Sequence, residues 1–482
     1  MPIRRRDFLR YAAAGTVLAA LGNRSARSDA AADKPNIILC MADDQGWGDM
    51  AYNGHPVLHT PHFDAMAAEG FRFDRFYAAS PVCSPTRASV MTGRTPNRMG
   101  CFRWGHTLRP QETTIAEALK TAGYATGHFG KWHIGSVQKG SPVNPGASGF
   151  DEWLSAPNFY ENDPILSREG IAVQLHGESS MVTVDAALEF IEKHTENGTP
   201  FLAVVWFGSP HRPHIAHERD LEPYADLEPA LANFYGEITG MDRAVGKLRG
   251  ELARLGIRDN TILWYCSDNG GLPNVGATGG RGHKGQIYEG GLLVPGLLEW
   301  PARIPQPRAS SVPCVTSDMY PTLLDIAGVT IDNQPPLDGI SLVPLLEGAM
   351  ETRPEPIGFW DYPAPGVRTP SNQWMTELLE AQKEGRETTE PERLRLDAGE
   401  ITQQYPDDQF PGHSAWLDWP WKLHRIEDAD GEVVFELYNL GQDPGEANDV
   451  LENQPDRTTE MRNQLEAWLR SVVHSLNGND YS

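Results

Sequence analysis

The chain has 482 residues, 40% of them hydrophobic, and a formal net charge of −24 at pH 7. This length and apolar content predict a globular protein with one large domain and a smaller one. An acidic body repels polyanions over long range, so nucleic acid is not an expected partner, and any anionic ligand must be held by local cationic groups.

The N-terminus has the composition of an export signal. Arginines at 4–6 precede a short apolar stretch at 11–21, and small residues then run to residue 32. This order predicts a signal peptide over residues 1–32, and hence a periplasmic or secreted protein. The arginine pair resembles a twin-arginine signal, which implies the twin-arginine export machinery as a partner. The alternative is an uncleaved anchor, but the apolar stretch is too short for a stable membrane span.

Two pairs of polar residues follow runs that are typical of buried strands. Residues 36–42 and 261–266 are apolar without alternation, as in strands covered on both faces. The polar pairs that follow them are Asp43 with Asp44 and Asp268 with Asn269. Their side chains offer only oxygen atoms, which favours a hard cation, Ca²⁺ or Mg²⁺, over Zn²⁺. Each pair alone is more typical of a solvated turn, but together in one sheet they predict a single metal site.

A cysteine motif lies at the predicted start of a helix. Cys83 is followed by Pro85, which suits a first helical turn, and by Arg87. Taken alone, this is also the pattern of an ordinary helix entry with a buried thiol. The motif gains weight because five basic residues follow other strand-like runs or lie in a glycine-dense loop: Lys131, His133, His211, His214 and Lys284. Ligands of open α/β sheets bind at the carboxyl ends of strands.

Helical patterns alternate with these strands. Helices are predicted at 61–69, at 115–122 behind a capping box, and at 238–255, where apolar residues recur every three or four positions. This alternation predicts an α/β domain over residues 33–353, with a large, mostly parallel sheet between layers of helices.

The pattern changes over residues 354–482. Strand-like runs at 421–424 and 433–438 and a final amphipathic helix predict a smaller antiparallel sheet plus a helix. Residues 376–410 are polar and are predicted to form an inserted excursion or a mobile flap. The tryptophans at 416–421 could form a sugar platform, but core packing is favoured.

The five cysteines are an odd number for an exported protein and indicate an unpaired thiol. Cys40 and Cys266 lie inside predicted strands and are expected to be inert. Cys101 and Cys314 could pair, although nothing in the sequence shows it.

These motifs together resemble type I sulfatases of the alkaline-phosphatase superfamily, from about Lys34 to the C-terminus. The shared elements occur in that family's order: Asp-Asp-x-Gly, Cys-x-Pro-x-Arg, Gly-Lys-Trp-His, Pro-His-x-Pro, Ser-Asp-Asn-Gly and Lys-x-x-x-Tyr-Glu-Gly-Gly. One departure is Leu293, where such sulfatases often carry an arginine. The resemblance implies an alkaline-phosphatase-like fold and sulfuric ester hydrolase activity.

The resemblance also implies a chemistry. In the family a maturation enzyme, which would be a partner here, oxidises the motif cysteine to Cα-formylglycine, and Cys83 would be the precursor. One hydroxyl of the hydrated aldehyde attacks sulfur and releases the alcohol, and the second then expels sulfate. Ca²⁺, with Mg²⁺ not excluded, would be held by the positions that match the family's site: Asp43, Asp44, Asp268, Asn269 and the modified Cys83.

Roles for the remaining polar residues follow from the same resemblance. Arg87 would stabilise the anionic form of the diol, and Lys131 and Lys284 would bind sulfate oxygens. His133 would remove a proton in the elimination step. His211, together with Lys284, would protonate the leaving alcohol.

The substrate is predicted to be a sulfated saccharide or polysaccharide, because an exported enzyme meets polymers first. Candidate contacts to it are Lys131, His211, Lys284, Arg103, Trp104, His106 and His214. Two alternatives stay open: a phosphonate or phosphate ester hydrolase on the same fold, and a non-catalytic glycan-binding protein. The cysteine and the single oxygen cluster favour sulfate over phosphorus, and the full set of matching polar positions argues against a binding protein.

Overall fold

The structure is a computed structural model that describes residues 34–387 and 390–481. The predicted signal peptide therefore lies outside the described residues. Residues Asn36–Ser482 form one compact unit, so the domain boundary expected at residue 353 stays a prediction.

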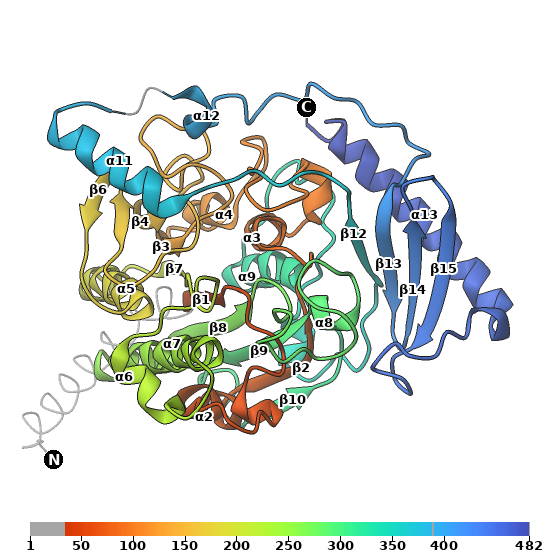
Figure 1. Cartoon of the computed structure of the whole chain (residues 1–482), viewed down its shortest axis with the longest axis horizontal. Helices are drawn as coiled ribbons and strands as arrows, with labels where there is room; N and C mark the ends of the chain where they lie inside the picture. The colour runs from red at the N-terminus through yellow and green to blue at the C-terminus, as the bar shows by residue number, and fades with distance from the viewer. Residues whose placement is uncertain (1–33, 388–389, 482) are drawn as a thin grey trace, which may run out of the picture. The chain divides into compact units, whose positions relative to one another are not determined.

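A large, twisted sheet is the centre of the described part of the chain (Figure 1). Its strands are β1 (Asn36–Ala42), β2 (Phe71–Tyr77), β3 (Ala125–Lys131), β4 (Glu152–Ala156), β5 (Ile165–Arg168), β6 (Ile171–Gln174), β7 (Phe201–Trp206), β8 (Thr261–Ser267), β9 (Leu293–Glu299), β10 (Arg308–Ser310) and β11 (Cys314–Val315). Their order is β10-β2-β9-β8-β1-β7-β3-β4-β5-β6, with β11 also paired to β2. The run β8-β1-β7-β3-β4 is parallel throughout, and antiparallel pairs flank it on both sides. The prediction of a large, mostly parallel sheet is confirmed.

Helices cover both faces of this sheet, which explains why its central strands are apolar without alternation. The helices of the first part of the chain are α2 (Pro61–Glu69), α3 (Cys83–Thr92), α4 (Ile115–Thr121), α5 (Ser179–Glu196), α6 (Glu218–Leu221), α7 (Pro229–Arg254), α8 (Glu289–Leu292), α9 (Met319–Ala327) and α10 (Val343–Leu346). Along β1, Ile37 and Met41 join the core under α3, α4 and α9, whereas Ile38 and Cys40 join the core under α2, α5 and α7. Both faces of one strand are therefore buried.

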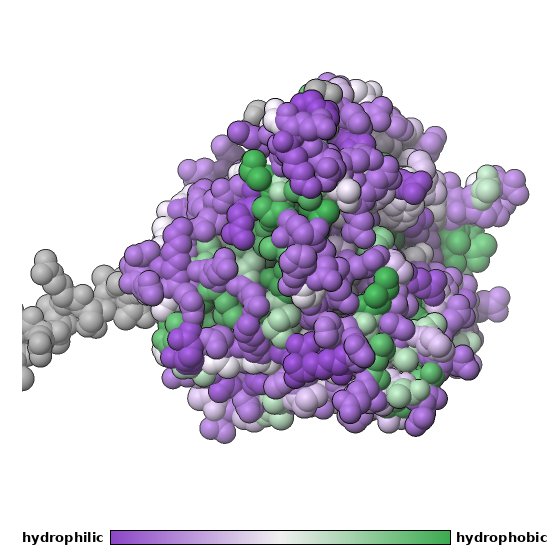
Figure 2. All heavy atoms as spheres, turned by 60° about the vertical axis from the view of Figure 1, so that its left-hand side comes forward, coloured by the Kyte–Doolittle hydropathy of each residue, from purple (hydrophilic) through white to green (hydrophobic). Residues whose placement is uncertain are grey.

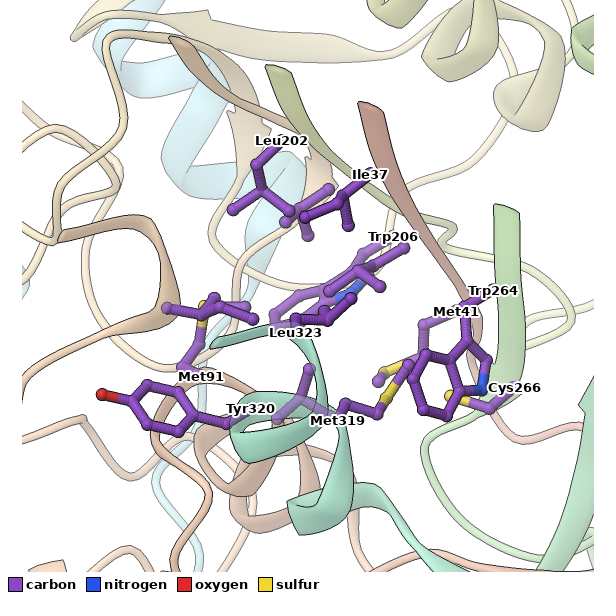
Figure 3. Close-up of a cluster of buried hydrophobic side chains, with 14 of the residues drawn as sticks. Ile37, Met41, Met91, Leu202, Trp206, Trp264, Cys266, Met319, Tyr320 and Leu323 are labelled. Atoms are coloured by element: carbon purple, nitrogen blue, oxygen red, sulfur yellow. The ribbon is translucent and has the colours of Figure 1, made fainter. Parts of the chain in front are cut away.

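The core on the α9 side contains large side chains from neighbouring strands. Trp206 of β7 and Trp264 of β8 are fully buried and lie near Met41 of β1, and Met319 and Leu323 of α9 close the cluster from below (Figure 3). Burial of such side chains contributes about 1.5–3 kcal/mol each. This packing fixes the strands whose ends carry the polar motifs.

A second, four-stranded antiparallel sheet follows in the chain, as predicted. It has the order β12-β13-β14-β15. The elements of this part are β12 (Ile357–Asp361), β13 (Gly412–Asp418), β14 (Trp421–Glu427), β15 (Val433–Asn439), α11 (Ser371–Lys383), α12 (Pro391–Leu394) and α13 (Pro455–Leu476). Trp416 packs with α13 in a hydrophobic cluster, which fits the core role that was favoured for it.

Two local predictions need correction. Lys131 does not follow a strand but is the last residue of β3, because the Gly-rich end of this strand still pairs with β7 and β4. The segment 376–410 is not wholly an excursion: it begins inside α11, whose Met375 and Leu378 are buried in the main core. The pairing of Cys101 with Cys314, which the sequence leaves open, is not present: both residues are buried free thiols.

One face of the molecule shows how polar its surface is. The face turned forward in Figure 2 is mostly hydrophilic, with hydrophobic residues in separate small areas. Within residues 34–387 and 390–481, no helix has the length and apolar character needed to span a bilayer.

Candidate active site

The polar motifs meet at the carboxyl ends of the central strands. Strands β3, β7, β1 and β8 are consecutive neighbours in the sheet and run parallel. Asp44 follows the end of β1, Asp268 follows β8, and Lys131 is the last residue of β3. His211 lies in the turn that follows β7. Segments more than two hundred residues apart in sequence are thereby brought to one edge of the sheet.

Three buried carboxylates in this site each contact a cationic side chain. Lys131 Nζ lies 2.5 Å from Asp43 Oδ2, and Lys284 Nζ lies 2.5 Å from Asp44 Oδ1. The Arg87 guanidinium donates twice to Asp268 Oδ2, at 2.6 and 3.1 Å. Each of the three carboxyl groups is thus paired with a cationic side chain, and this pairing offsets the cost of burying it.

The donor set fits a hard cation. Two buried oxygens, Asp43 Oδ1 and Asn269 Oδ1, have no hydrogen-bond partner among the described residues, and such orphaned acceptors call for an unseen donor or ion. One ligand atom each of Asp43, Asp44 and His211 lies within 4.8 Å of the others. Carboxylate and amide oxygens are the ligands that Ca²⁺ and Mg²⁺ prefer. Asp268 is less available, because Arg87 and the Asp44 backbone N–H occupy its two oxygens.

Backbone conformation marks the same place. Asp44 and His133 both have positive φ, 72° and 57°. This left-handed region is uncommon for residues other than glycine, and such residues cluster at functional sites. Asp44 is turned so that its N–H meets Asp268 Oδ1 at 3.1 Å while its carboxylate meets Lys284.

Cys83 begins helix α3, as predicted, and Gly93 ends it with a left-handed φ of 72°. The thiol is 1% exposed. Burial raises the pKa of Cys83, and the nearby charges of Lys131 and Lys284 lower it by less. The residue is therefore a protonated thiol at neutral pH, surrounded by the groups that the sequence assigned to the same site.

The two histidines of the site are neutral. Burial, followed by the charges of Lys131 and Arg87, holds the pKa of His133 well below its ordinary value, and neither ring nitrogen has a hydrogen-bond partner among the described residues. Burial likewise holds the pKa of His211 well below its ordinary value. The His211 ring stacks on Phe159 at 4.1 Å between ring centroids, and its Nε2 lies 3.6 Å from Asp44 Oδ2. Phe159 was missed in the sequence because no motif surrounds it.

The neighbouring carboxyls Asp43 and Asp44 titrate differently. Burial raises the pKa of Asp43 to about 8, and the charge of Lys131 opposes this rise. Burial raises the pKa of Asp44, but the positive charges of Lys284 and Lys131 and the hydrogen bond from Lys284 together hold it below its ordinary value. The pKa values of these two neighbouring carboxyls are therefore shifted in opposite directions.

The side chains that are predicted to contact the sugar form interactions within the protein. Arg103 pairs with Asp361 at 2.7 Å, and the His106 ring lies between the carbonyl oxygens of Gly100 and Pro365. His106 also lines a cavity of about 310 Å³. His214 is turned inward, with Nδ1 3.8 Å from the Glu237 carboxylate. The substrate contacts of these three residues stay predictions.

Comparison with known proteins identifies the family of the chain. The sequence model of the family described as Sulfatase matches residues 35–329. The chain belongs to the sulfatase family. This sulfatase is 33% identical over 384 residues to N-acetylgalactosamine-6-sulfatase of Mus musculus, covering 70% of this chain and 71% of that protein. It is 31% identical over 386 residues to arylsulfatase G of Rattus norvegicus, covering 67% of this chain and 70% of that protein.

A solved structure agrees in fold over most of the sulfatase. The crystal structure of Ps i-CgsB in complex with k-i-k-neocarrahexaose has a TM-score of 0.75 and 25% sequence identity, and the match covers 91% of this chain and 93% of that chain. The resemblance noted from the motifs is thus confirmed: this is a type I sulfatase of the alkaline-phosphatase superfamily, and a sulfuric ester hydrolase.

A divalent cation should bind this sulfatase more tightly as pH rises. Asp43 must lose its proton before it can bind a cation, so between pH 6 and 8 the Kd for Ca²⁺ should fall by up to about tenfold per pH unit. Calorimetric titration of chelator-treated protein measures this. Asp43→Asn, which has no proton to lose, should bind more weakly with a flatter pH profile, and a wild-type Kd that does not change with pH would contradict the assignment.

Proposed function

We propose that this sulfatase is exported and hydrolyses sulfate esters of a sulfated saccharide, using a formylglycine derived from Cys83 and one bound Ca²⁺. The observation that carries the proposal is the meeting of Asp43, Asp44 and Asp268 with three cationic side chains around Cys83 at one edge of the sheet. An anionic ester and a divalent cation are the two kinds of ligand that such a site suits.

The state of Cys83 supports its modification. As a buried thiol with a raised pKa it is protonated at neutral pH, whereas the thiolate is the nucleophilic form. Formylglycine, installed by a maturation enzyme, supplies a hydrated aldehyde whose hydroxyl is the nucleophile. Helix α3 also directs its N-terminus at this position, and a helix N-terminus favours an anionic group.

The metal site is proposed from two buried oxygens without partners, Asp43 Oδ1 and Asn269 Oδ1, and from the neighbouring carboxylate of Asp44. Asp43, Asp44 and Asn269 would hold the ion directly, and Asp268, tied to Arg87, would complete the set. A bound Ca²⁺ would supply Lewis-acid chemistry and would add two positive charges to the site. The site would then attract the singly charged sulfate ester.

The cationic side chains bind and orient the sulfate group. Lys131 is a buried ammonium group, Lys284 is a partly exposed one, and Arg87 is held in place by Asp268. Donors that are already in place contribute more than the same groups would in solution. The three side chains come from three different elements: the end of β3, a loop and α3.

The histidines move protons. His133 is neutral with unpaired ring nitrogens, the state required of a general base. His211 is neutral in the free protein, but a sulfate ester beside its ring favours the protonated form, from which it protonates the leaving alcohol. Stacking on Phe159 fixes the plane of that ring.

A saccharide substrate is supported by the relatives. The mouse relative is named for the 6-sulfate of N-acetylgalactosamine, and the solved neighbour holds a neocarrahexaose. In this chain, Arg103, Trp104 and His106 directly follow the catalytic helix region, and Trp104 is 42% exposed. An exposed aromatic ring beside cationic and imidazole groups suits a sulfated sugar.

Sulfate release from a panel of sulfated oligosaccharides tests this function. The panel includes an aryl sulfate and a phosphonate ester, the enzyme is produced with a formylglycine-generating partner, and mass spectrometry confirms the aldehyde at residue 83. We expect free sulfate from the wild type and none from Cys83→Ala. Turnover of the phosphonate alone would favour the phosphorus alternative, and no turnover despite the aldehyde would favour a binding protein.

His211→Ala tests the leaving-group role. Loss of a general acid should lower kcat/KM by about 10²–10⁴-fold for sugar sulfates, whose alcohols leave poorly, and far less for an activated nitrophenyl sulfate. His214→Ala is the matched control from the same turn, and its effect should not depend on the leaving group. Equal losses on both substrates for His211→Ala would sink the assignment.

Export through the twin-arginine route is tested at the N-terminus. The double substitution Arg5→Lys and Arg6→Lys keeps the charge but removes the arginine pair, so activity and protein should stay in the cytoplasmic fraction. Arg4→Lys is the control and should be exported normally. Unchanged export of the double variant, measured by fractionation, would show that another route is used.

A further inference from the structure

The loop that carries Lys284 is held at both ends by the C-terminal sheet. We name residues 279–291 the Lys284 loop. Its start and end are joined by a hydrogen bond from the Gly290 N–H to the Arg281 carbonyl at 2.7 Å. The Lys284 N–H donates to the Gly271 carbonyl, and the Gly285 N–H donates to the Pro81 carbonyl, two residues before Cys83. These hydrogen bonds close the backbone of the loop into a ring, and this backbone ring contacts the segment just before the catalytic helix.

At one end of the ring, Glu289 enters a buried charge network. The Glu289 N–H donates to Glu446 Oε2 at 2.7 Å, and Lys422 Nζ donates to Glu289 Oε1 at 2.9 Å. Lys422 also lies 3.1 Å from Glu446 Oε1, to which the His424 ring is bonded at 2.8 Å. Lys422, His424 and Glu446 are all 0% exposed. These three residues come from β14 and from the turn after β15.

At the other end of the ring, Arg281 meets the same sheet. Its Nη1 donates to the Tyr438 hydroxyl at 3.0 Å and to the Glu446 carbonyl at 3.2 Å. Its guanidinium lies 3.9 Å from the centroid of the Tyr288 ring, and the Tyr288 hydroxyl donates to Glu436 at 2.9 Å. Glu446 thus contacts both ends of the ring, one through its side chain and the other through its carbonyl.

We propose that the C-terminal sheet positions the sulfate-binding ammonium group of Lys284, with Glu446 and Lys422 as the positioning residues. The inference rests on the proposed function, since it assumes that Lys284 binds the sulfate ester. Lys284 is three residues from Arg281 and five from Glu289, so the closed ring transmits the placement of its two ends to the Lys284 backbone. In this buried network each positive or negative group has a partner, and few other arrangements would satisfy all of them. The network therefore holds the ends of the Lys284 loop in place.

A double-mutant cycle tests this coupling. Glu446→Gln removes the charge that faces Lys422 and His424 but keeps an oxygen for the Glu289 N–H. In the wild-type background it should raise KM for the sulfate ester and lower kcat/KM by about tenfold or more. In the Lys284→Ala background the same substitution should change kcat/KM by less than about threefold, because the group it positions is gone. Equal losses in both backgrounds would overturn the proposal.

Hydrogen exchange gives a readout that does not need activity. Amide exchange of the peptide 279–291 should be faster in Glu446→Gln than in the wild type. Arg98→Met is the matched control: Arg98 is also buried and joins Asp338 to α13, but it makes no contact with the Lys284 loop in the described structure. It should lower Tm without changing exchange of that peptide or kcat/KM.

A milder variant can be used if Glu446→Gln does not fold. Arg281→Gln alters the opposite end of the ring at a partly exposed side chain and should show the same non-additivity with Lys284→Ala. If wild-type enzyme releases no sulfate, the proposed function fails, whereas the exchange experiment still decides whether the sheet anchors the loop. If sulfate is released but the cycle is additive and exchange is unchanged, only this inference fails.

Discussion

The architecture of the site is set by carboxyl groups that the sheet buries side by side. Their negative charges repel one another, so they require cationic partners. Asp43, Asp44 and Asp268 follow neighbouring strands, and each is almost fully buried. Ionised groups in such a place are tolerated only when cations and hydrogen bonds offset their desolvation. Arg87, Lys131 and Lys284 supply that charge from a helix, a strand end and a loop, so three separate parts of the chain must be correctly placed before the site can exist.

Much of this could be predicted because local patterns carried it. Strands β1, β7 and β8 are buried on both faces and are therefore apolar without alternation, and each is followed by polar residues. The start of α3 at Cys83 and its end at Gly93 follow from the conformational preferences of Pro85 and Gly93. The order of the motifs in the sequence alone indicates the family.

The remaining features depend on contacts between distant segments, which leave no local mark. Nothing near Asp268 indicates that Arg87 occupies one of its oxygens, and nothing near His211 indicates a ring at Phe159. Nothing near Glu446 in the sequence indicates that its side chain is buried and bonded to a histidine and a lysine. Helix α11 was obscured by the polar composition of its outward side.

The pairing of β1 with β8 also sets a minimum delay during synthesis, because β1 must wait until β8 has been made. Asn36 contacts Thr261, 225 residues further along the chain. At about 5–20 residues per second, a ribosome needs about 10–45 s to supply that partner. Contacts of such wide separation also form slowly once the chain is complete. In that interval Cys83 is not yet enclosed by the strands and loops that leave it 1% exposed in the finished fold, so the growing chain offers its thiol to another protein in a way that the folded one does not.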